Sequence, residues 1–413
     1  MFSNPLFIII IILIIFIILL LFYKKSIEEE RKKKNYFISK QIYNTKYNQQ
    51  YLEKFSKATT KTYNSMYGGK EISFKAVKDN DGKMKFFVYI INYNNNNLIE
   101  YDILKNIKNI NSNFISYDNN EIGKEIKINK PTSIRTCITN NKNYITSFND
   151  NKIYIIDTSD ILKKTENFID LGENKGPTYI DLYRPDNKDN IYGYTSNYND
   201  NTVSILDLNN NKKIKDIKVG KNPSFVCVAE KKQILFVANY SSNNISCFDL
   251  DKSGNTKEIE DIEVGKNPTC IEINSEETKI YITNYGDSTI SVFNIENNII
   301  EDSIIKIPNE AKPYSIDFNT TNKIGAILTN KGIYLIDTAK DNNLELVDFS
   351  DKESNEMGEI TSARYRYYEK NDKKYEYLFI KNNDGKLFRK VITNKENIDQ
   401  DKFINFEPLY NFL

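Results

Sequence analysis

Five lysines precede a recurring proline, and their type and spacing suggest binding chemistry. The prolines Pro131, Pro177, Pro223, Pro268 and Pro313 are separated by 46, 46, 45 and 45 residues. An ammonium group at the start of each repeat would form a basic ring able to receive an anionic ligand or an acidic partner. The alternative is that duplication copied a solvated loop lysine that binds nothing. The five are Lys130, Lys175, Lys221, Lys266 and Lys312.

Four tyrosines form a second recurring set, because the apolar runs of several repeats end in Asn-Tyr. Exposed tyrosine is favoured at protein interfaces, so these side chains are candidates for binding on the same face as the lysines. The preceding asparagines are interpreted as turn caps, because their side chains bond nearby backbone amides. The tyrosines are Tyr93, Tyr198, Tyr240 and Tyr285.

Few residues of this sequence are candidates for catalysis. The chain contains no histidine, which removes an imidazole base, a haem ligand and a common metal ligand. Asp79-Asn-Asp-Gly82 begins like a calcium loop, but Lys83 stands at its fifth position, so we predict a hairpin turn. The four cysteines lack a Cys-x-x-Cys pair and are expected to be buried free thiols. We therefore predict a non-enzyme without catalytic, metal or cofactor-binding residues.

The elements that position the lysines and tyrosines are repeats of about 45 residues. Val219-Gly-Lys-Asn-Pro223 recurs as Val264-Gly-Lys-Asn-Pro268, and each opening is followed by apolar runs that end in Asn-Tyr, Asp or Asn. A fixed period in the 40s with short alternating strands is typical of a propeller blade. In this topology the loop before the first strand and the turn after the second share one face.

Seven such units extend from residue 68 to the C-terminus. The first is irregular, with strands expected from Glu71 to Val77, Phe86 to Asn92 and Leu98 to Asp102. The last is equally irregular, with strands expected from Ile360 to Tyr368, Tyr375 to Asn382 and Lys386 to Ile392. We therefore predict an all-β, seven-bladed β-propeller over residues 68–413.

The N-terminal part has a different composition. Leu6 to Tyr23 is an apolar run of 18 residues, long enough for a membrane helix, without the basic start or the cleavage site of a signal peptide. We predict a transmembrane anchor at residues 1–25, followed by a charged helical stalk at residues 26–67. Lysine and arginine after the run favour a cytoplasmic propeller on a single-pass membrane protein, while the opposite orientation stays open.

The repeats resemble the YVTN-type β-propeller family. The name-giving tetrapeptide stands here as Tyr281-Ile-Thr-Asn284 and, changed, as Phe236-Val-Ala-Asn239 and Tyr194-Thr-Ser-Asn197. The resemblance implies a seven-bladed propeller of the quinoprotein or lactonase-like superfamily, whose members include surface proteins, haem domains and sugar-lactone hydrolases. A lactonase activity would need a base and positioned arginines, and Arg135 on a first strand is the arginine to test.

Taken together, these features favour a membrane-anchored propeller that binds a protein or an anionic ligand and catalyses nothing. The formal net charge of +1 argues against nucleic acid as the partner. Two alternatives remain, because one fold can host many functions. One is a lactonase-like hydrolase or cofactor-dependent enzyme with its site at the mouth of the channel, and the other is a cell-surface or envelope adhesion protein.

Overall fold

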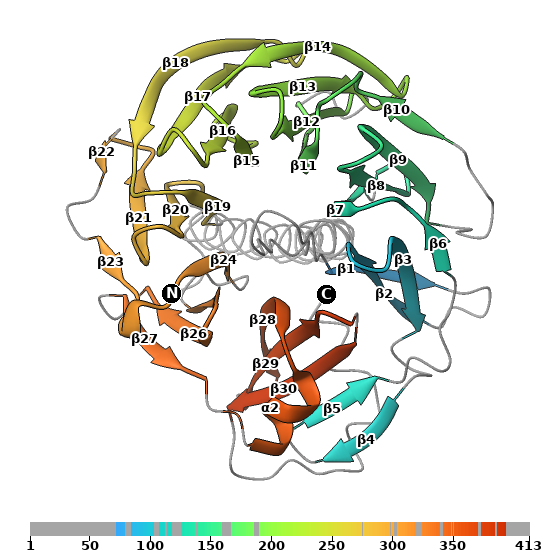
Figure 1. Ribbon diagram of the computed structural model, residues 1–413, viewed down its shortest axis with the longest axis vertical. Helices are drawn as coiled ribbons and strands as arrows, with labels where there is room; N and C mark the ends of the chain where they lie inside the picture. Colours follow the sequence, from blue (N-terminus) through green and yellow to red (C-terminus); the bar gives the residue numbers. More distant parts are fainter. Residues whose placement is uncertain are drawn as a thin grey trace, which may run out of the picture. The chain divides into compact units, whose positions relative to one another are not determined.

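Seven antiparallel sheets form a ring in the computed structural model of the chain (Figure 1). The structure describes residues 72–393, apart from gaps at 79–83, 103–106, 112–113, 118–124, 138, 159–166, 186–189, 275, 298, 301–303, 319–323, 339–341, 348, 350, 371–372 and 385. All described residues belong to one unit that spans residues 54–413. The seven-bladed β-propeller expected from the repeats is confirmed.

Each blade has its first strand at the centre of the ring, and in blades 1 to 6 the last strand lies at the rim. Blade 1 consists of β1 (Ile72–Lys78), β2 (Met84–Asn92), β3 (Asn97–Asp102) and β6 (Glu125–Lys127). Blade 2 consists of β7 (Pro131–Cys137), β8 (Lys142–Ser147), β9 (Lys152–Asp157) and β10 (Phe168–Asp170). Blade 3 consists of β11 (Pro177–Tyr183), β12 (Tyr192–Asn197), β13 (Thr202–Asp207) and β14 (Lys212–Lys218).

The next three blades repeat this order. Blade 4 consists of β15 (Pro223–Ala229), β16 (Ile234–Asn239), β17 (Asn244–Leu250) and β18 (Thr256–Glu263). Blade 5 consists of β19 (Pro268–Ile273), β20 (Lys279–Asn284), β21 (Thr289–Asn294), β22 (Ile299–Ile300) and β23 (Ile305–Lys306), and the 3-10 turn η3 (Pro308–Glu310) follows it. Blade 6 consists of β24 (Pro313–Phe318), β25 (Ile324–Thr329), β26 (Gly332–Asp337) and β27 (Asn343–Leu346).

Blade 7 closes the ring with strands borrowed from an early part of the chain. Helix α2 (Asp351–Met357) precedes β28 (Ile360–Lys370), β29 (Lys373–Asn382) and β30 (Leu387–Thr393). The outer positions are taken by β5 (Phe114–Tyr117) and β4 (Ile107–Asn111), a hairpin inserted between β3 and β6 of blade 1. The first and last blades are thus joined by backbone hydrogen bonds, which explains why both terminal units depart from the repeat.

Hydroxyl side chains tie neighbouring blades together beside the recurring prolines. The residue after each of the first four recurring prolines donates its hydroxyl to the carbonyl oxygen of the proline that begins the next blade. The pairs are Thr132 to Pro177 (2.8 Å), Thr178 to Pro223 (3.2 Å), Ser224 to Pro268 (3.0 Å) and Thr269 to Pro313 (3.3 Å). Proline lacks an N–H, so its place on an inner edge strand leaves no backbone donor unpaired.

The two family motifs contact each other within a blade. Asn284 at the end of β20 is fully buried, and its Nδ2 donates to the hydroxyls of Thr289 (3.0 Å) and Ser291 (2.9 Å) on β21. A Cβ on Gly265 would lie 2.6 Å from Nδ2 of Asn284, so the glycine leaves room for this cap. Gly220 and Asn239 repeat the arrangement in blade 4. These asparagines therefore tie the second strand to the third through side-chain groups, and their Oδ1 atoms accept no hydrogen bond in the described structure. The bonds to backbone amides that the sequence predicted occur at Asn92, whose Oδ1 accepts from the amides of Asn94 (3.1 Å) and Asn95 (3.2 Å).

The predicted membrane localisation is corrected. Within the residues that the structure describes, no helix is long and apolar enough to cross a bilayer. The apolar run from Leu6 to Tyr23 and the charged segment at residues 26–67 lie outside the described residues. The prediction of a single-pass membrane protein is therefore not supported. It depended on a membrane helix that was inferred from the hydropathy of this apolar run alone.

Candidate functional site

The lysine loops and the tyrosine turns lie on one face of the ring. Backbone amides of the turns donate to carbonyl oxygens of the loops, from Asn199 to Lys175 (3.1 Å) and from Tyr240 to Asn222 (3.1 Å). The same contact joins Tyr285 to Asn267 (3.0 Å) in the next blade. We call this side of the propeller, where first strands begin and second strands end, the loop face.

The five lysines fall into two registers. Lys130 and Lys312 directly precede their prolines, whereas the other three stand one residue earlier. Lys130 Nζ lies 4.6 Å from the ring centroid of Tyr93, and Lys312 Nζ lies 5.0 Å from that of Tyr285. Cation–π contacts of this kind hold an ammonium group over an aromatic face. Lys221 and Lys266 are exposed, so the structure does not bring the five into one equivalent set.

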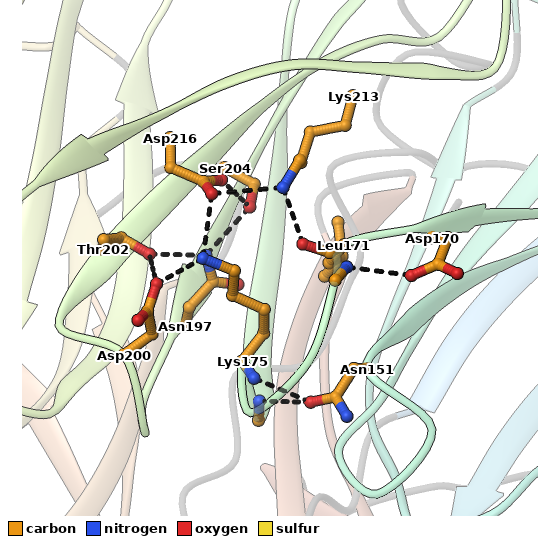
Figure 2. A network of polar contacts seen from close by, with 12 residues as sticks. Asn151, Asp170, Leu171, Lys175, Asn197, Asp200, Thr202, Ser204, Lys213 and Asp216 are labelled. Carbon is orange, nitrogen blue, oxygen red and sulfur yellow. Dashed lines mark hydrogen bonds and ion pairs between the residues drawn. The ribbon is translucent and has the colours of Figure 1, made fainter.

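Lys175 belongs to a polar network inside blade 3 (Figure 2). Its Nζ pairs with Asp200 and lies 2.8 Å from Oδ2 of Asp216, and its side chain is only 12% exposed. Lys213 also reaches Asp216 (3.1 Å) and donates to the carbonyl oxygen of Leu171 (2.7 Å). Because both acids hold its ammonium group, Lys175 stabilises the blade and is not available to a ligand.

In blade 4, Asp261 takes the place that Asp216 has in blade 3, but no lysine pairs with it in the described structure. Asp261 accepts hydrogen bonds from Asn244 (2.7 Å) and Ser246 (3.3 Å), as Asp216 accepts one from Ser204 (2.6 Å). Partial burial raises the pKa of Asp261, and the negative charges of Glu258 and Glu263 raise it further. Burial alone would also raise the pKa of Asp216, but hydrogen bonds from Lys175, Ser204 and Lys213 lower it.

The two aspartates give a matched pair of expected results. We expect Asp216→Asn to lower the free energy of unfolding at pH 7 by about 1–2 kcal/mol, because it removes charge-assisted hydrogen bonds. Since the folded pKa is depressed, this contribution is present above the pKa of the unfolded chain and is lost as the pH falls through the folded pKa. We expect Asp261→Asn to be neutral or stabilising at pH 7. Urea unfolding of both variants from pH 7 down to pH 3 checks this, and equal losses at pH 7 would contradict it.

Tyr285, which lies under Lys312, has two tyrosine neighbours on the loop face. The ring centroids of Tyr285 and Tyr314 are 5.4 Å apart, and both rings are half-buried. Burial raises the pKa of Tyr314 to about 12, with Tyr285 and Glu359 adding to the shift. Tyr240 is also half-buried, and burial followed by the neighbouring Tyr285 raises its pKa. Tyr198 is half-buried in its own turn, whereas Tyr93 is buried.

A second group of polar residues occupies the middle of the first strands. Arg135 NH2 lies 2.8 Å from Oδ1 of Asp181 in the next blade. Burial by itself would lower the pKa of Arg135, but the Asp181 carboxylate raises it. Asp317 pairs with Arg364 of blade 7, and both side chains are almost fully buried at 4% and 1% exposure.

These residues all stand at the fifth position of their strands. We call them the girdle residues, and they are Arg135, Asp181, Cys227, Glu272, Asp317 and Arg364. The sequence singled out Arg135 for testing and Cys227 as a buried thiol, but it gave no role to Asp181, Glu272, Asp317 and Arg364. Aligning the repeats on their prolines places all of them except Arg364 in one column, because β28 begins at Ile360 and not at a proline. The structure shows that this column joins blades, because Val228 N donates to Asp181 Oδ2 (2.9 Å) and Tyr365 N to Asp317 Oδ2 (3.3 Å).

Other sequence features resolve as parts of the fold. All four cysteines are buried and free, as expected, and they are Cys137, Cys227, Cys247 and Cys270. No group of three or more acidic, cysteine or histidine side chains suited to a metal occurs in the described part of the chain. Asn239 begins a formal glycosylation signal, but its side chain is fully buried.

Comparison with known proteins supports this architecture. The family model described as "Lactonase, 7-bladed beta-propeller" matches residues 142–264. Among curated proteins there is no match. Virginiamycin B lyase from Staphylococcus aureus is 13% identical with a TM-score of 0.54, covering 80% of this chain and 98% of its own. BBS1N, solved in complex with ARL6DN, is 12% identical with a TM-score of 0.53, covering 76% of this chain and 90% of its own.

At such low identity, these solved structures show that the fold is shared, and they carry no information about the activity of this chain. One of the two is a lyase and the other is part of a protein complex, which illustrates how far functions diverge on this architecture. The seven sheets identify the chain as a seven-bladed β-propeller, and its Val-Gly-x-x-Pro and Tyr-x-x-Asn motifs, together with the match over residues 142–264, make it similar to the YVTN-like propeller family.

Proposed function

We propose that this propeller is a binding protein that receives an anionic partner on its loop face. The observation that carries the proposal is the pairing of Lys312 with Tyr285, whose ring lies beside Tyr314. A lysine held over an aromatic ring keeps its charge at a fixed point next to apolar surface. Carboxylate or phosphate groups with an adjoining apolar part suit such a surface.

Exposed cations extend this surface across neighbouring blades. Lys221 and Lys266 occupy the same register in blades 4 and 5, and both are exposed. Their loops border the turns that carry Tyr240 and Tyr285. The resulting strip alternates ammonium groups with half-buried tyrosine rings. Tyrosine is enriched at protein interfaces, and the ammonium groups favour a partner of negative charge. Lys175 is left out of the proposed site because Asp200 and Asp216 hold it.

Charge reversal on the loop face tests the proposal. The full chain is titrated with a fluorescein-labelled glutamate-rich peptide and with inorganic pyrophosphate as probes. We expect the triple variant Lys221→Glu, Lys266→Glu and Lys312→Glu to weaken binding of at least one probe by tenfold or more, about 1.4 kcal/mol. Tyr240→Ala with Tyr285→Ala is expected to weaken the peptide and leave pyrophosphate less affected, because the rings supply the apolar contact.

A control with the same change in net charge separates this site from bulk electrostatics. Lys231, Lys232 and Lys252 lie in turns at the opposite ends of the strands. Their triple change to glutamate is expected to alter binding less than threefold. Equal losses for both triple variants, or no binding by the parent chain, would contradict the proposal.

A second candidate function, a lactonase-like hydrolase, is favoured by the family match over residues 142–264 and by the girdle residues. Glu272 lies among them with Arg135 and Asp181 at equivalent positions of other blades. In such a reaction a carboxylate takes a proton from water, and the water oxygen bonds to the lactone carbonyl carbon. The ring C–O bond then breaks, and the protonated carboxyl group returns its proton to the leaving oxygen to give a hydroxy acid.

Assays of the purified full chain with sugar lactones and simple γ-lactones test this candidate. Turnover that falls by about 10²–10⁴ in Glu272→Gln would establish it, since general acid–base groups contribute on that scale. Arg135→Gln with an unchanged KM and a lowered kcat would add a role for the girdle arginine in the transition state. Absence of turnover on every lactone tested would remove this candidate.

A further inference from the structure

The two longest outer strands of the propeller lie next to each other on the rim. Of the outer strands that the structure describes, β14 has 7 residues and β18 has 8, whereas the others have between 2 and 5. Figure 1 shows β14 and β18 following one another along the edge of the ring. An outer strand presents unpaired backbone groups on its free side, so these two strands form the longest open edge of the described molecule.

These neighbouring strands carry opposite charge. Strand β14 reads Lys-Lys-Ile-Lys-Asp-Ile-Lys, four lysines against one aspartate, for a net charge of +3. Strand β18 reads Thr-Lys-Glu-Ile-Glu-Asp-Ile-Glu, four acids against one lysine, for a net charge of −3. Two blades of an otherwise nearly neutral chain therefore place a basic strip and an acidic strip side by side at the rim.

The charged side chains point to solvent rather than to one another. Lys212, Lys215 and Lys218 of β14 are exposed, as are Glu258, Glu260 and Glu263 of β18. Within the described part of the chain, none of these six forms an ion pair. Ile214, midway along β14, is one of the few large apolar side chains on the surface, at 48% exposure.

We propose that β14 and β18 form the interface of a twofold symmetric dimer of this chain. A twofold axis parallel to the axis of the ring exchanges left and right along the rim. It therefore sets β14 of one copy against β18 of the other, and the acidic strip of the first against the basic strip of the second. Both contacts form in the same dimer, as a twofold interface requires.

Symmetry selects this arrangement over the alternative. A twofold axis that lies along the rim would set β14 against β14 and β18 against β18, which opposes like charges. The first arrangement pairs three lysines with three glutamates twice, and it covers Ile214 of each copy. The inference concerns the rim and does not depend on the ligand proposed for the loop face.

Charged edge strands also occur simply because they prevent strands from pairing with other chains. Charges of either sign protect an edge strand in this way, so protection does not require a basic strand beside an acidic one. It predicts a monomer at every salt concentration. The proposed dimer predicts association that weakens as salt screens the opposing charges.

Reciprocal charge reversal distinguishes the two. Variant B14 carries Lys212→Glu, Lys215→Glu and Lys218→Glu, and variant A18 carries Glu258→Lys, Glu260→Lys and Glu263→Lys. All experiments use the full chain at about 100 μM, a concentration that populates complexes with micromolar Kd. We expect the parent chain to sediment as a dimer at about 50 mM NaCl. At about 500 mM NaCl the Kd of the dimer is expected to rise by tenfold or more, because the Debye length shortens severalfold.

Each variant alone is expected to lose self-association by at least tenfold in Kd, because like charges then face each other. Mixed together, B14 and A18 are expected to recover it, since two acidic strips meet two basic strips. Purified B14 bearing an affinity tag should therefore retain untagged purified A18, and not untagged B14. Both variants keep residues 1–71, so any association through that segment would be equal in all samples.

The outcomes decide the proposal in either direction. Recovery in the mixture, together with a folded circular dichroism spectrum for each variant, would establish the rim interface. A parent chain that is monomeric at low salt would overturn it. So would variants that associate as well as the parent, or a mixture of folded B14 and A18 that shows no heterodimer.

Discussion

Replacing Asp317 with alanine is expected to lower the free energy of unfolding by about 3–5 kcal/mol, because it leaves the Arg364 guanidinium buried without its carboxylate. Both side chains of this pair are almost fully buried, and they join blade 6 to blade 7. The carboxylate also accepts the backbone N–H of Tyr365 at 3.3 Å. Chemical denaturation of the full chain, followed by circular dichroism, measures the loss.

A second variant separates the free-energy cost of the unpaired Arg364 charge from the cost of the lost packing volume. The double change Asp317→Leu with Arg364→Met removes both charges and keeps apolar volume. We expect it to recover most of the stability, because replacing a buried ion pair by apolar residues is often neutral. A double variant as unstable as Asp317→Ala would contradict this account and would show that the hydrogen bond to Tyr365 dominates.

Replacing Gly265 with alanine is expected to cost about 1–3 kcal/mol, because the added methyl group overpacks a buried site. Its Cβ would lie 2.6 Å from Nδ2, 2.7 Å from Cγ and 2.9 Å from Cβ of Asn284. Asn284 cannot move aside easily, since Thr289 and Ser291 hold its amide group. Gly265 has no positive φ, so the cost arises from space and not from backbone strain.

The neighbouring residue supplies the control for this glycine. Lys266→Ala changes an exposed side chain in the same loop and is expected to alter the free energy of unfolding by less than about 0.5 kcal/mol. Gly220→Ala in blade 4 is expected to match Gly265→Ala, because its Cβ would lie 2.6 Å from Cγ of Asn239. Denaturant midpoints of the three variants check the prediction, and a stable Gly265→Ala would show that the cap can shift.

Strand positions were largely predictable, because alternation and turn residues are local properties. The second strand of the last blade was expected from Tyr375 to Asn382 and is observed at Lys373–Asn382. Its first strand was expected from Ile360 to Tyr368 and is observed at Ile360–Lys370. The hairpin of β4 and β5 was not predicted, because it pairs with β30, more than 270 residues away in sequence. No local pattern reports such a partner.

The candidate site was predicted in part. The repeats placed lysines and tyrosines on the loop face, and the backbone contacts between loops and turns agree with that placement. The sequence could not show that Lys175 is held by Asp200 and Asp216 while Lys221 is exposed, since both follow the same pattern. The binding role of these residues and the absence of catalysis stay predictions.

The sequence by itself determined the number of blades, the register of their first strands and the asparagines at which several second strands end. Each of these depends on residues within about one repeat, so periodicity records them. Only the tertiary structure decided which polar side chains meet across blades, as Arg364 meets Asp317 and as Arg135 meets Asp181. It also decided that the strand closing blade 7 comes from blade 1, because ring closure brings together residues from opposite ends of the chain.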